Sequence, residues 1–203
     1  MITALRATSE TLAAAVRRSL RTEPTLAALF AAPGAVSLAT PDEMAQAGTT
    51  GLSVWLYRVD RDDMLLNMDE ETVDVSLIRR RPLPVRLHYL FTPIISLTAA
   101  TAPETEQHIL GAVLQTFHDH PFLRGPDLEG DFAGTDVELT VRLEHLALEE
   151  TTRIWDSLDR SYQLCLSYEV SVVLIASRLP DQRVPIVIGA EIETGTAIAG
   201  SPP

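Results

Sequence analysis

The residues that most resemble a chemical site are the two histidines of His118-Asp119-His120, because imidazole is a common metal ligand. On a helix, residues two apart point about 200° away from each other, so both rings reach one metal ion only if the helix unwinds. The triplet also ends a predicted helix, where a histidine interacts favourably with the helix dipole. We therefore favour a polar helix end over a metal site.

Other reactive residue types occur singly. His88 and His108 each stand alone, and Cys165 lies in an apolar run that is typical of a buried, inert thiol. All 16 basic residues are arginine, so Schiff-base and P-loop lysine chemistry are excluded. The sequence contains no G-x-S-x-G, G-x-G-x-x-G or C-x-x-C motif. We expect no enzyme activity, no cofactor and no metal.

Carboxylates are dense between Asp60 and Asp74, which raises the possibility of a calcium site. Their spacing does not match the EF-hand loop with its central glycine and final bidentate glutamate. We favour a solvated acidic segment over a calcium site.

Composition sets the broad class of the protein. The chain has 203 residues, 46% of them hydrophobic, and a formal net charge of −12, which is typical of a soluble globular domain. Binding to nucleic acid is not expected, because a phosphate-binding surface needs a basic stripe. Membrane insertion is not expected either, since no apolar run reaches the roughly 18 residues that a membrane helix needs.

One N-terminal pattern leaves the cellular location open. Arg17-Arg18 precede the apolar run 25–32, and together they resemble a twin-arginine export signal. Glu23-Pro24 interrupt the approach and Pro33-Gly34 end the run early. The pattern favours retention in the cytoplasm over export.

Helical spacing of apolar residues predicts three helices. The first covers about Thr3–Arg21. The second follows Pro103, ends before Pro121 and has an apolar face listed as Ile109, Leu110, Val113, Leu114 and Phe117. The third is short, spans Leu148–Leu158 and turns Ile154, Trp155 and Leu158 inward.

Strand patterns separate these helices. We expect strands at 35–39, Leu52–Val59, Val85–Phe91, Val137–Leu143, Gln163–Ala176 and 184–188, with a connector at 40–51 and a hairpin turn at 179–183. The strand Leu52–Val59 is apolar on both faces and should be central. The polar segment 60–81 is expected to form a long exposed excursion that contains a hairpin.

These elements predict an α+β fold: a mixed, largely antiparallel sheet flanked by two longer helices and one short helix. We expect a single domain over residues 1–193 and a flexible C-terminal tail over residues 194–203.

The ordered series of elements also matches a known family. The series consists of the Trp55–Val59 strand, Pro82-Leu-Pro-Val-Arg-Leu-His-Tyr-Leu-Phe91, His118-Asp-His-Pro121 and Glu150 to Trp155 followed by Leu166-Ser-Tyr-Glu-Val170. It resembles the cap, or tube-terminator, proteins of extracellular contractile injection systems of the antifeeding-prophage and Photorhabdus virulence cassette type, which are similar to phage tail terminators. The likeness spans about Ile2 to Ile188.

The resemblance implies a structural role. Members of that family form a ring, usually of six subunits, that closes the end of the inner tube distal to the baseplate and engages the last sheath ring. The implied partners are further copies of the chain, the inner tube protein and the sheath protein. The implied location is the bacterial cytoplasm, within an assembled particle that is either released or retained.

A subunit interface follows as a hypothesis from the charges of the excursion. The basic block Arg79, Arg80 and Arg81 could pair head-to-tail with acidic residues of the next subunit, namely Asp60, Asp62, Asp63, Glu70 and Glu71. Two unrelated solvated faces are the alternative. A second hypothesis is that the excursion or the tail adds a strand to a sheath or tube subunit. Competing functions are a monomeric protein-binding adaptor or assembly chaperone and, more remotely, an enzyme that uses His118.

Overall fold

The computed structural model describes residues 2–65, 71–74, 77–79, 81–95, 102–180 and 182–183, with side chains for 2–65, 81–95 and 102–180. The chain divides into two compact units, residues 1–68 with 82–176 and residues 69–81 with 177–203. The predicted domain end at residue 193 and the predicted tail 194–203 lie outside the described residues and remain predictions.

The first unit is organised around a six-stranded sheet with the strand order β1-β2-β5-β8-β7-β6. Its strands are β1 (Val36–Ser37), β2 (Gly51–Arg61), β5 (Leu83–Ile94), β6 (Phe122–Arg124), β7 (Glu138–Glu144) and β8 (Leu166–Ile175). Only β1 and β2 are parallel, and every other neighbouring pair is antiparallel. The predicted α+β class with a mixed, largely antiparallel sheet is confirmed.

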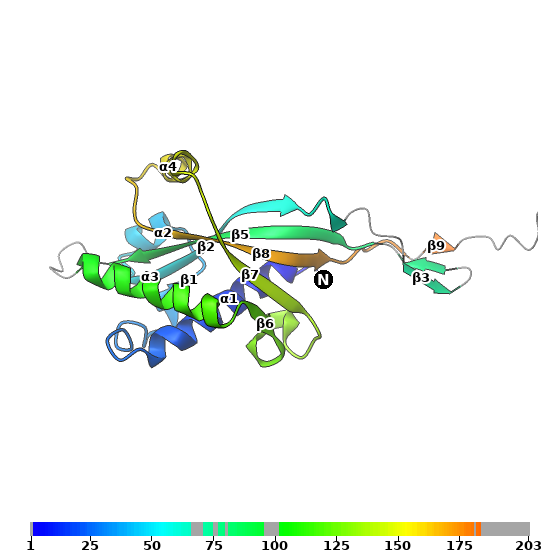
Figure 1. The fold of residues 1–203 in the computed structure, drawn as a ribbon, viewed down its shortest axis with the longest axis horizontal. Helices are drawn as coiled ribbons and strands as arrows, with labels where there is room; N and C mark the ends of the chain where they lie inside the picture. The colour runs from blue at the N-terminus through cyan, green and yellow to red at the C-terminus, as the bar shows by residue number, and fades with distance from the viewer. Residues whose placement is uncertain are drawn as a thin grey trace, which may run out of the picture. The chain divides into compact units, whose positions relative to one another are not determined.

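Two long helices cover one face of this sheet. Figure 1 shows α1 (Ala4–Thr22) and α3 (Ala102–Asp119) on the same side of the strands. Their apolar stripes meet the sheet in one core, which includes Leu12, Val16, Leu20, Val54, Leu87, Ile109, Val113 and Val170. The predicted apolar face of α3 is correct except at Leu114, which is 38% exposed.

Strand β5 alternates as its sequence predicts. Val85, Leu87 and Tyr89 are buried against the helices, and the Tyr89 hydroxyl lies 2.8 Å from the Ser9 hydroxyl of α1. Further along, Phe91 packs edge-to-face against the rings of Phe117 in α3 and Tyr168 in β8. This packing fixes which face of β5 is apolar, so Arg86 and His88 must point to the other face.

Strand β2 is not central, because β1 alone lies beyond it and pairs only with Leu52 and Ser53. The two strands approach closely at Gly51, where φ is +153° and a Cβ atom would lie 1.9 Å from the Ala35 carbonyl oxygen. Glycine is therefore required where β2 begins.

A short helix occupies part of the predicted connector 40–51. Helix α2 (Pro41–Gln46) begins with a capping box, in which the Glu43 amide donates to the Thr40 hydroxyl and the Thr40 amide donates to the Glu43 carboxylate. It packs against β2 and β5. The prediction of a connector was wrong here because the helix is only 6 residues long, too short for a visible apolar period.

Helix α4 (Leu148–Ser157) lies on the side of the sheet opposite α1 and α3 (Figure 1). Trp155 is 1% exposed, whereas Ile154 and Leu158, also predicted to face inward, are only half-buried. The segment after α4 is fixed to α2 by an ion pair between Arg160 and Asp42 at 3.1 Å. Short 3-10 helices in the described part of the first unit include Pro33–Ala35, Gly125–Asp127 and Gly130–Phe132.

The second unit contains an antiparallel three-stranded sheet in the order β3-β4-β9. Strands β3 (Glu71–Asp74) and β4 (Leu77–Arg79) form the hairpin predicted within the excursion. The predicted turn at 179–183 was wrong at its end, because Gln182–Arg183 form β9 and pair with β4. The predicted strand 184–188 lies outside the described residues.

Candidate interaction surface

Polar side chains gather on the sheet face opposite α1 and α3. The strand registers place Arg58 beside His88, His88 beside Glu169, and Arg142 beside Glu169. The residues on this face are Arg58 and Asp60 of β2, Arg86 and His88 of β5, Ser167 and Glu169 of β8, and Arg142 and Glu144 of β7. We call this set the polar face.

Glu144 is the centre of a hydrogen-bonded cluster on the polar face. Its carboxylate accepts hydrogen bonds from the hydroxyl of Ser167 at 2.7 Å and from that of Tyr57 at 3.1 Å. It also lies 3.1 Å from Nη2 of Arg58 and 3.1 Å from Nδ1 of His88. Charged and neutral donors therefore converge on one carboxylate, which is the arrangement that makes a partly buried charge stable.

His88 links this carboxylate to a second one. Its side chain is 3% exposed, and its Nε2 atom lies 3.1 Å from Oδ2 of Asp60. A doubly protonated ring donates to both Glu144 and Asp60, whereas a neutral ring donates to only one of them. The sequence analysis predicted an isolated histidine at position 88. In the structure, His88 instead links Asp60 of β2 to Glu144 of β7.

The cluster perturbs the titration of two of its members. Burial by itself raises the pKa of Glu144, but hydrogen bonds from Ser167 and His88 outweigh burial and hold that pKa below its ordinary value. Burial raises the pKa of Tyr57 to about 12. Glu144 therefore stays ionised and Tyr57 stays protonated at neutral pH, which keeps the hydrogen bond between them intact.

The contact between Arg58 and Glu144 joins two strands that are not neighbours in the sheet. Strands β5 and β8 lie between β2 and β7, so the two backbones are three strand spacings apart, roughly 14 Å in a flat sheet. Side chains that stand perpendicular to a flat sheet would not meet over that distance. The 3.1 Å contact therefore shows that these two long side chains lean toward each other across β5 and β8, over the polar face.

A second ion pair stands at the end of β2. Asp62 is 3% exposed, and its Oδ2 atom accepts a hydrogen bond from Nε of Arg86 at 2.9 Å. Its other oxygen accepts from the amides of Met64 at 3.0 Å and Leu65 at 3.3 Å. The hydrogen bond from Arg86 holds the pKa of Asp62 below its ordinary value. Asp62 therefore serves to fix the end of β2.

The acidic residues of the hypothesised subunit interface fall in different environments. Asp60 and Asp63 are exposed at 48% and 76%, whereas Asp62 is buried within its own chain. Asp63 pairs with Arg61 at 2.9 Å. Only Asp60 and Asp63 among these three present a carboxylate to solvent.

The remaining residues of that interface belong to the second unit. Glu71 and Arg79 are directly opposite each other in the β3–β4 register of one chain. Arg81 is exposed, whereas Glu70 and Arg80 lie outside the described residues. Pairing of these residues between subunits remains a prediction.

The histidines and the cysteine that the sequence analysis weighed as possible reactive residues do not come together in one site. His118 and His120 are exposed at the end of α3, as predicted, and His108 contacts the Thr25 hydroxyl at 3.2 Å. Within the described ranges, no group of three or more His, Cys, Asp or Glu side chains could hold a metal ion. Burial raises the pKa of the Cys165 thiol, which agrees with the predicted inert cysteine.

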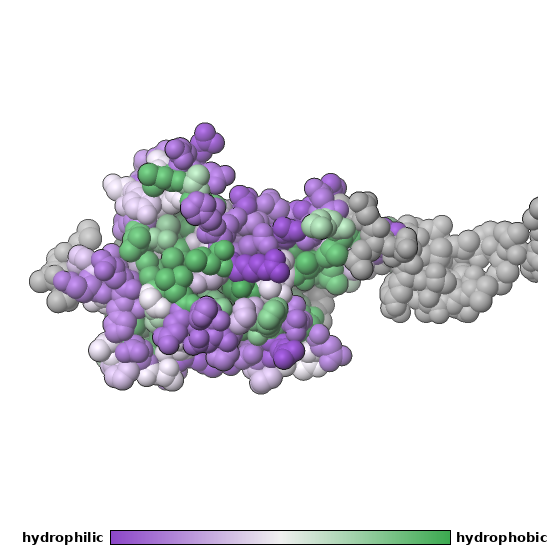
Figure 2. Space-filling model, viewed as in Figure 1, coloured by the Kyte–Doolittle hydropathy of each residue, from purple (hydrophilic) through white to green (hydrophobic). Residues whose placement is uncertain are grey.

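Apolar surface gathers beside the polar face and at the margin of that face next to α4. Figure 2 shows it between α3 and α4. A groove of about 510 Å³ runs between α3 and β7 and is lined by Leu114, Gln115, Phe117, His118, Val141, Leu143 and Tyr168. A second hollow of about 440 Å³ lies between β7 and α4. Exposed apolar side chains at such grooves are typical of protein–protein contacts.

Comparison with known proteins identifies the family. Residues 7–188 match the family described as the Pvc16 N-terminal domain. The chain belongs to this family. The resemblance found in the sequence is thereby confirmed over nearly the whole chain.

Two solved structures share the fold of this Pvc16 N-terminal domain protein. One is the cryo-EM structure of the sheath/tube terminator of PVC, an extracellular contractile injection system, in its extended state, with a TM-score of 0.60, 16% identity and 98% coverage of this chain. The other is the cryo-EM structure of the tube-terminating cap of the anti-feeding prophage, with a TM-score of 0.52, 19% identity and 88% coverage. The chain spans 65% and 58% of the lengths of those two chains. No curated protein matches this Pvc16 N-terminal domain protein in sequence.

Within the part of the chain that the structure describes, no helix combines the length and apolarity needed to cross a bilayer.

The sequence analysis did not predict the polar cluster around Glu144. Its signal was a repeated pattern, in which each of four strands carries two polar residues two positions apart, and only the strand registers bring these pairs together.

Proposed function

We propose that this chain is the tube terminator of a contractile injection system. Copies of it, six as the family resemblance implies, form a ring that closes the end of the inner tube distal to the baseplate and engages the last sheath ring. The ring assembles in the bacterial cytoplasm as part of the particle. Its role is structural and requires neither catalysis nor a cofactor.

The family match over residues 7–188 carries this proposal. The shared fold with a sheath/tube terminator and with a tube-terminating cap supports it. The exposed apolar groove and the polar face are also suited to protein contacts, since they supply both aliphatic surface and charges that set register.

The physical task of a terminator is to bind a growing end without offering a new one. The last ring of a tube exposes the surface on which the next ring would polymerise. A cyclic head-to-tail interface closes on itself, so a ring of terminators can cover that surface and leave no unpaired contact for further growth. A monomeric adaptor would have no such closure.

The hypothesised contacts of the excursion form a finer part of this proposal. Pairing of Arg79, Arg80 and Arg81 with Asp60, Asp63, Glu70 and Glu71 of the next subunit would add charge contacts to the ring. Reversing the charge of the three arginines should then lower ring yield at physiological salt, as measured by native mass spectrometry. An unchanged yield would remove these contacts and leave the terminator role intact.

Deletion of the gene in a strain that makes the particle tests the function. We expect overlong or uncapped tubes in electron micrographs, with normal lengths restored by a plasmid-borne copy. A catalytically motivated control, His118→Ala with His120→Ala, should restore them equally well. Intact particles of normal length in the deletion strain would contradict the proposal.

A further inference from the structure

Two strands of the six-stranded sheet have backbone edges without a neighbour among the described residues. Beyond Ser53, the outer edge of β2 has no partner, because β1 pairs only with Leu52 and Ser53. At the opposite side of the sheet, β6 pairs with β7 only over Glu138–Thr140. The second half of β7 is therefore open as well. Open edges present unpaired amide and carbonyl groups that another strand can bind.

The backbone hydrogen bonds show which residues point outward at each edge. The amide of Val141 donates to the Pro121 carbonyl at 2.8 Å, on the side of β7 away from β8. Backbone direction alternates along a strand, so Leu143 also points its amide and carbonyl outward. Directly after β2, the Asp62 amide donates to the Pro84 carbonyl of β5 at 3.0 Å. By the same alternation, the amide and carbonyl of Val59 point away from β5.

The side chains of Leu143 and Val59 are both apolar and both exposed, so they could pack against each other. Leu143 is 57% exposed and Val59 is 45% exposed. The registers place Leu143 opposite Tyr168 and Val59 opposite Leu87, so both belong to the face covered by α1 and α3. A valine brought beside Leu143 would enter the groove between α3 and β7.

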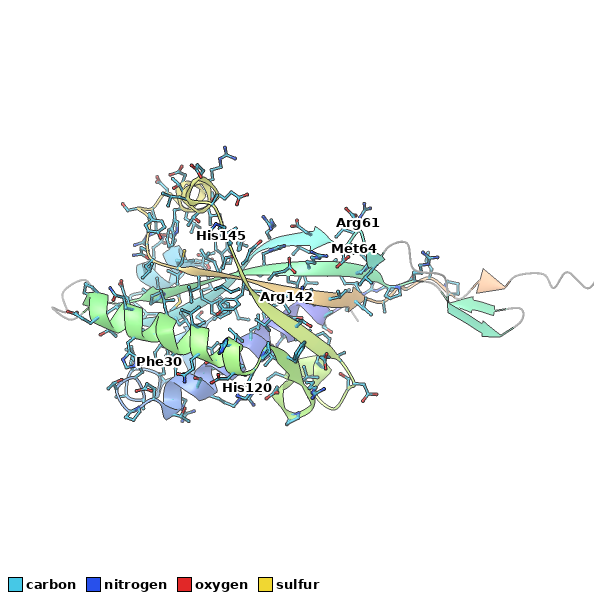
Figure 3. The ribbon with its side chains drawn as sticks, in the orientation of Figure 1. Phe30, Arg61, Met64, His120, Arg142 and His145 are labelled. Atoms are coloured by element: carbon cyan, nitrogen blue, oxygen red, sulfur yellow. The ribbon has the colours of Figure 1, made fainter. Side chains whose placement is uncertain are left out.

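Charges select one register for pairing these edges. If Leu143 of one copy lies opposite Val59 of another in an antiparallel pair, Arg142 lies opposite Asp60 on the polar face. Asp60 contacts Arg58 and His88 of its own chain through Oδ2 at 3.0 and 3.1 Å and is still 48% exposed. Arg142 is exposed and has no ion-pair partner among the described residues. Figure 3 labels Arg142 on β7 and Arg61 at the end of β2. Directly opposite residues of unlike charge stabilise a strand pair.

The neighbouring registers lack this complementarity. A shift of two residues in one direction brings Asp60 opposite Glu144, and the same shift in the other direction brings Arg58 opposite Arg142. Both alternatives oppose like charges, which destabilises a pair. A shift of one residue would turn every side chain to the wrong face.

We propose that copies of this chain join head-to-tail by pairing the open edge of β7 in one copy with the open edge of β2 in the next. This inference rests on the proposed terminator function and names the surface through which the ring closes. Three antiparallel steps separate β2 from β7, so the two strands run in opposite directions. Rotation about an axis along the strands preserves strand direction, and β7 therefore meets the next β2 in antiparallel orientation.

The ladder between copies is short. The Val141 amide already donates to the Pro121 carbonyl, so the ladder between copies is centred on the pair Leu143–Val59. Arg61, which would lie opposite Val141, falls beyond the end of this ladder. The rest of the contact consists of Val59 in the groove and the pair between Arg142 and Asp60. Such a contact is weak alone and gains strength when the ring closes.

A charge-reversal cycle tests the pairing. Arg142→Glu places a carboxylate opposite Asp60, and Asp60→Arg places an arginine opposite Arg142, so each variant should raise the concentration for half-assembly by about tenfold or more. The double variant restores opposite charges and should recover assembly. Arg153→Glu, on the exposed side of α4, is the matched control and should assemble like the wild type. Sedimentation velocity over a concentration series measures all four.

A backbone test separates strand pairing from charge. Leu143→Pro removes the outward amide and leaves the hydrogen bonds to β8, whereas Leu143→Ala removes only the side chain. We expect the proline variant to assemble less well than the alanine variant, with both circular dichroism spectra unchanged.

Two outcomes distinguish this inference from the function it rests on. If the wild-type chain assembles and Leu143→Pro, Arg142→Glu and Asp60→Arg all assemble equally well, the edge pairing is wrong and the terminator ring stands. If the wild-type chain stays monomeric at every concentration and the deletion strain still makes normal particles, both are wrong.

Discussion

The two faces of the six-stranded sheet are stabilised in opposite ways. The face under α1 and α3 buries aliphatic and aromatic side chains, such as Leu87 and Phe91, which are both 0% exposed. The other face carries a charged cluster in which Glu144 joins residues of three other strands. The first face depends on the hydrophobic effect, which needs only apolar area, whereas the second depends on the exact mutual satisfaction of donors and acceptors.

The largest expected effect comes from the apolar face. Leu87→Ala removes a fully buried side chain and leaves a cavity between β5 and the helices, so the free energy of unfolding should fall by about 2–5 kcal/mol. Urea denaturation monitored by circular dichroism measures this. The control is Leu174→Ala, which alters a side chain of β8 that is 52% exposed and should change stability by less than about 0.5 kcal/mol. Equal losses at the two leucines would contradict the assignment of the core to the helix-covered face.

A smaller loss is expected from the polar face. Glu144→Ala leaves the hydroxyls of Ser167 and Tyr57 and the His88 ring without their shared acceptor, and should lower the free energy of unfolding by about 1–3 kcal/mol. Glu138→Ala is the matched control on β7, because Glu138 is 47% exposed and its one ion-pair partner among the described residues is Arg124. That variant should lose less than about 1 kcal/mol. If Glu144→Ala is no worse than Glu138→Ala, the cluster contributes nothing beyond a surface ion pair.

The smallest effect is the pH dependence of that contribution. The pKa of Glu144 is lower in the folded chain than its ordinary value, so the unfolded chain binds more protons in acid. The stabilisation is fully present above the ordinary carboxyl range near pH 4 and is lost as pH falls through the folded pKa. Denaturation midpoints measured from neutral pH to pH 3 should therefore fall more steeply for the wild type than for Glu144→Gln. Parallel curves would show that Glu144 is not the group responsible.

The helix-covered face was largely predictable from sequence, and the reason is periodicity. The spacing of Leu12 and Val16 identifies the buried stripe of α1, and the alternation of Val85, Leu87 and Tyr89 identifies the buried side of β5. Burial of apolar area is a property of each residue by itself, so it appears in the local pattern.

The polar face was not predictable in the same way. Glu144 meets Arg58 across two intervening strands and 86 positions of sequence, and no local pattern encodes that distance. Helix α2 is a different case, because the capping residues Thr40 and Glu43 were present as a signal. No helical spacing of apolar residues followed this capping signal, so the sequence analysis did not predict α2.

The contact between Glu144 and Arg58 also bears on the angle between the two open edges of the sheet. The strand edges at the two sides of a twisted sheet point in different directions, and in the ring proposed above the difference between these directions is the turn that one copy makes around the ring axis. That turn multiplied by the number of copies must complete a circle. If copies join edge to edge as proposed, the contact that ties Arg58 of β2 to Glu144 of β7 would hold that angle constant, and a variant without it would form rings with a wider range of copy numbers.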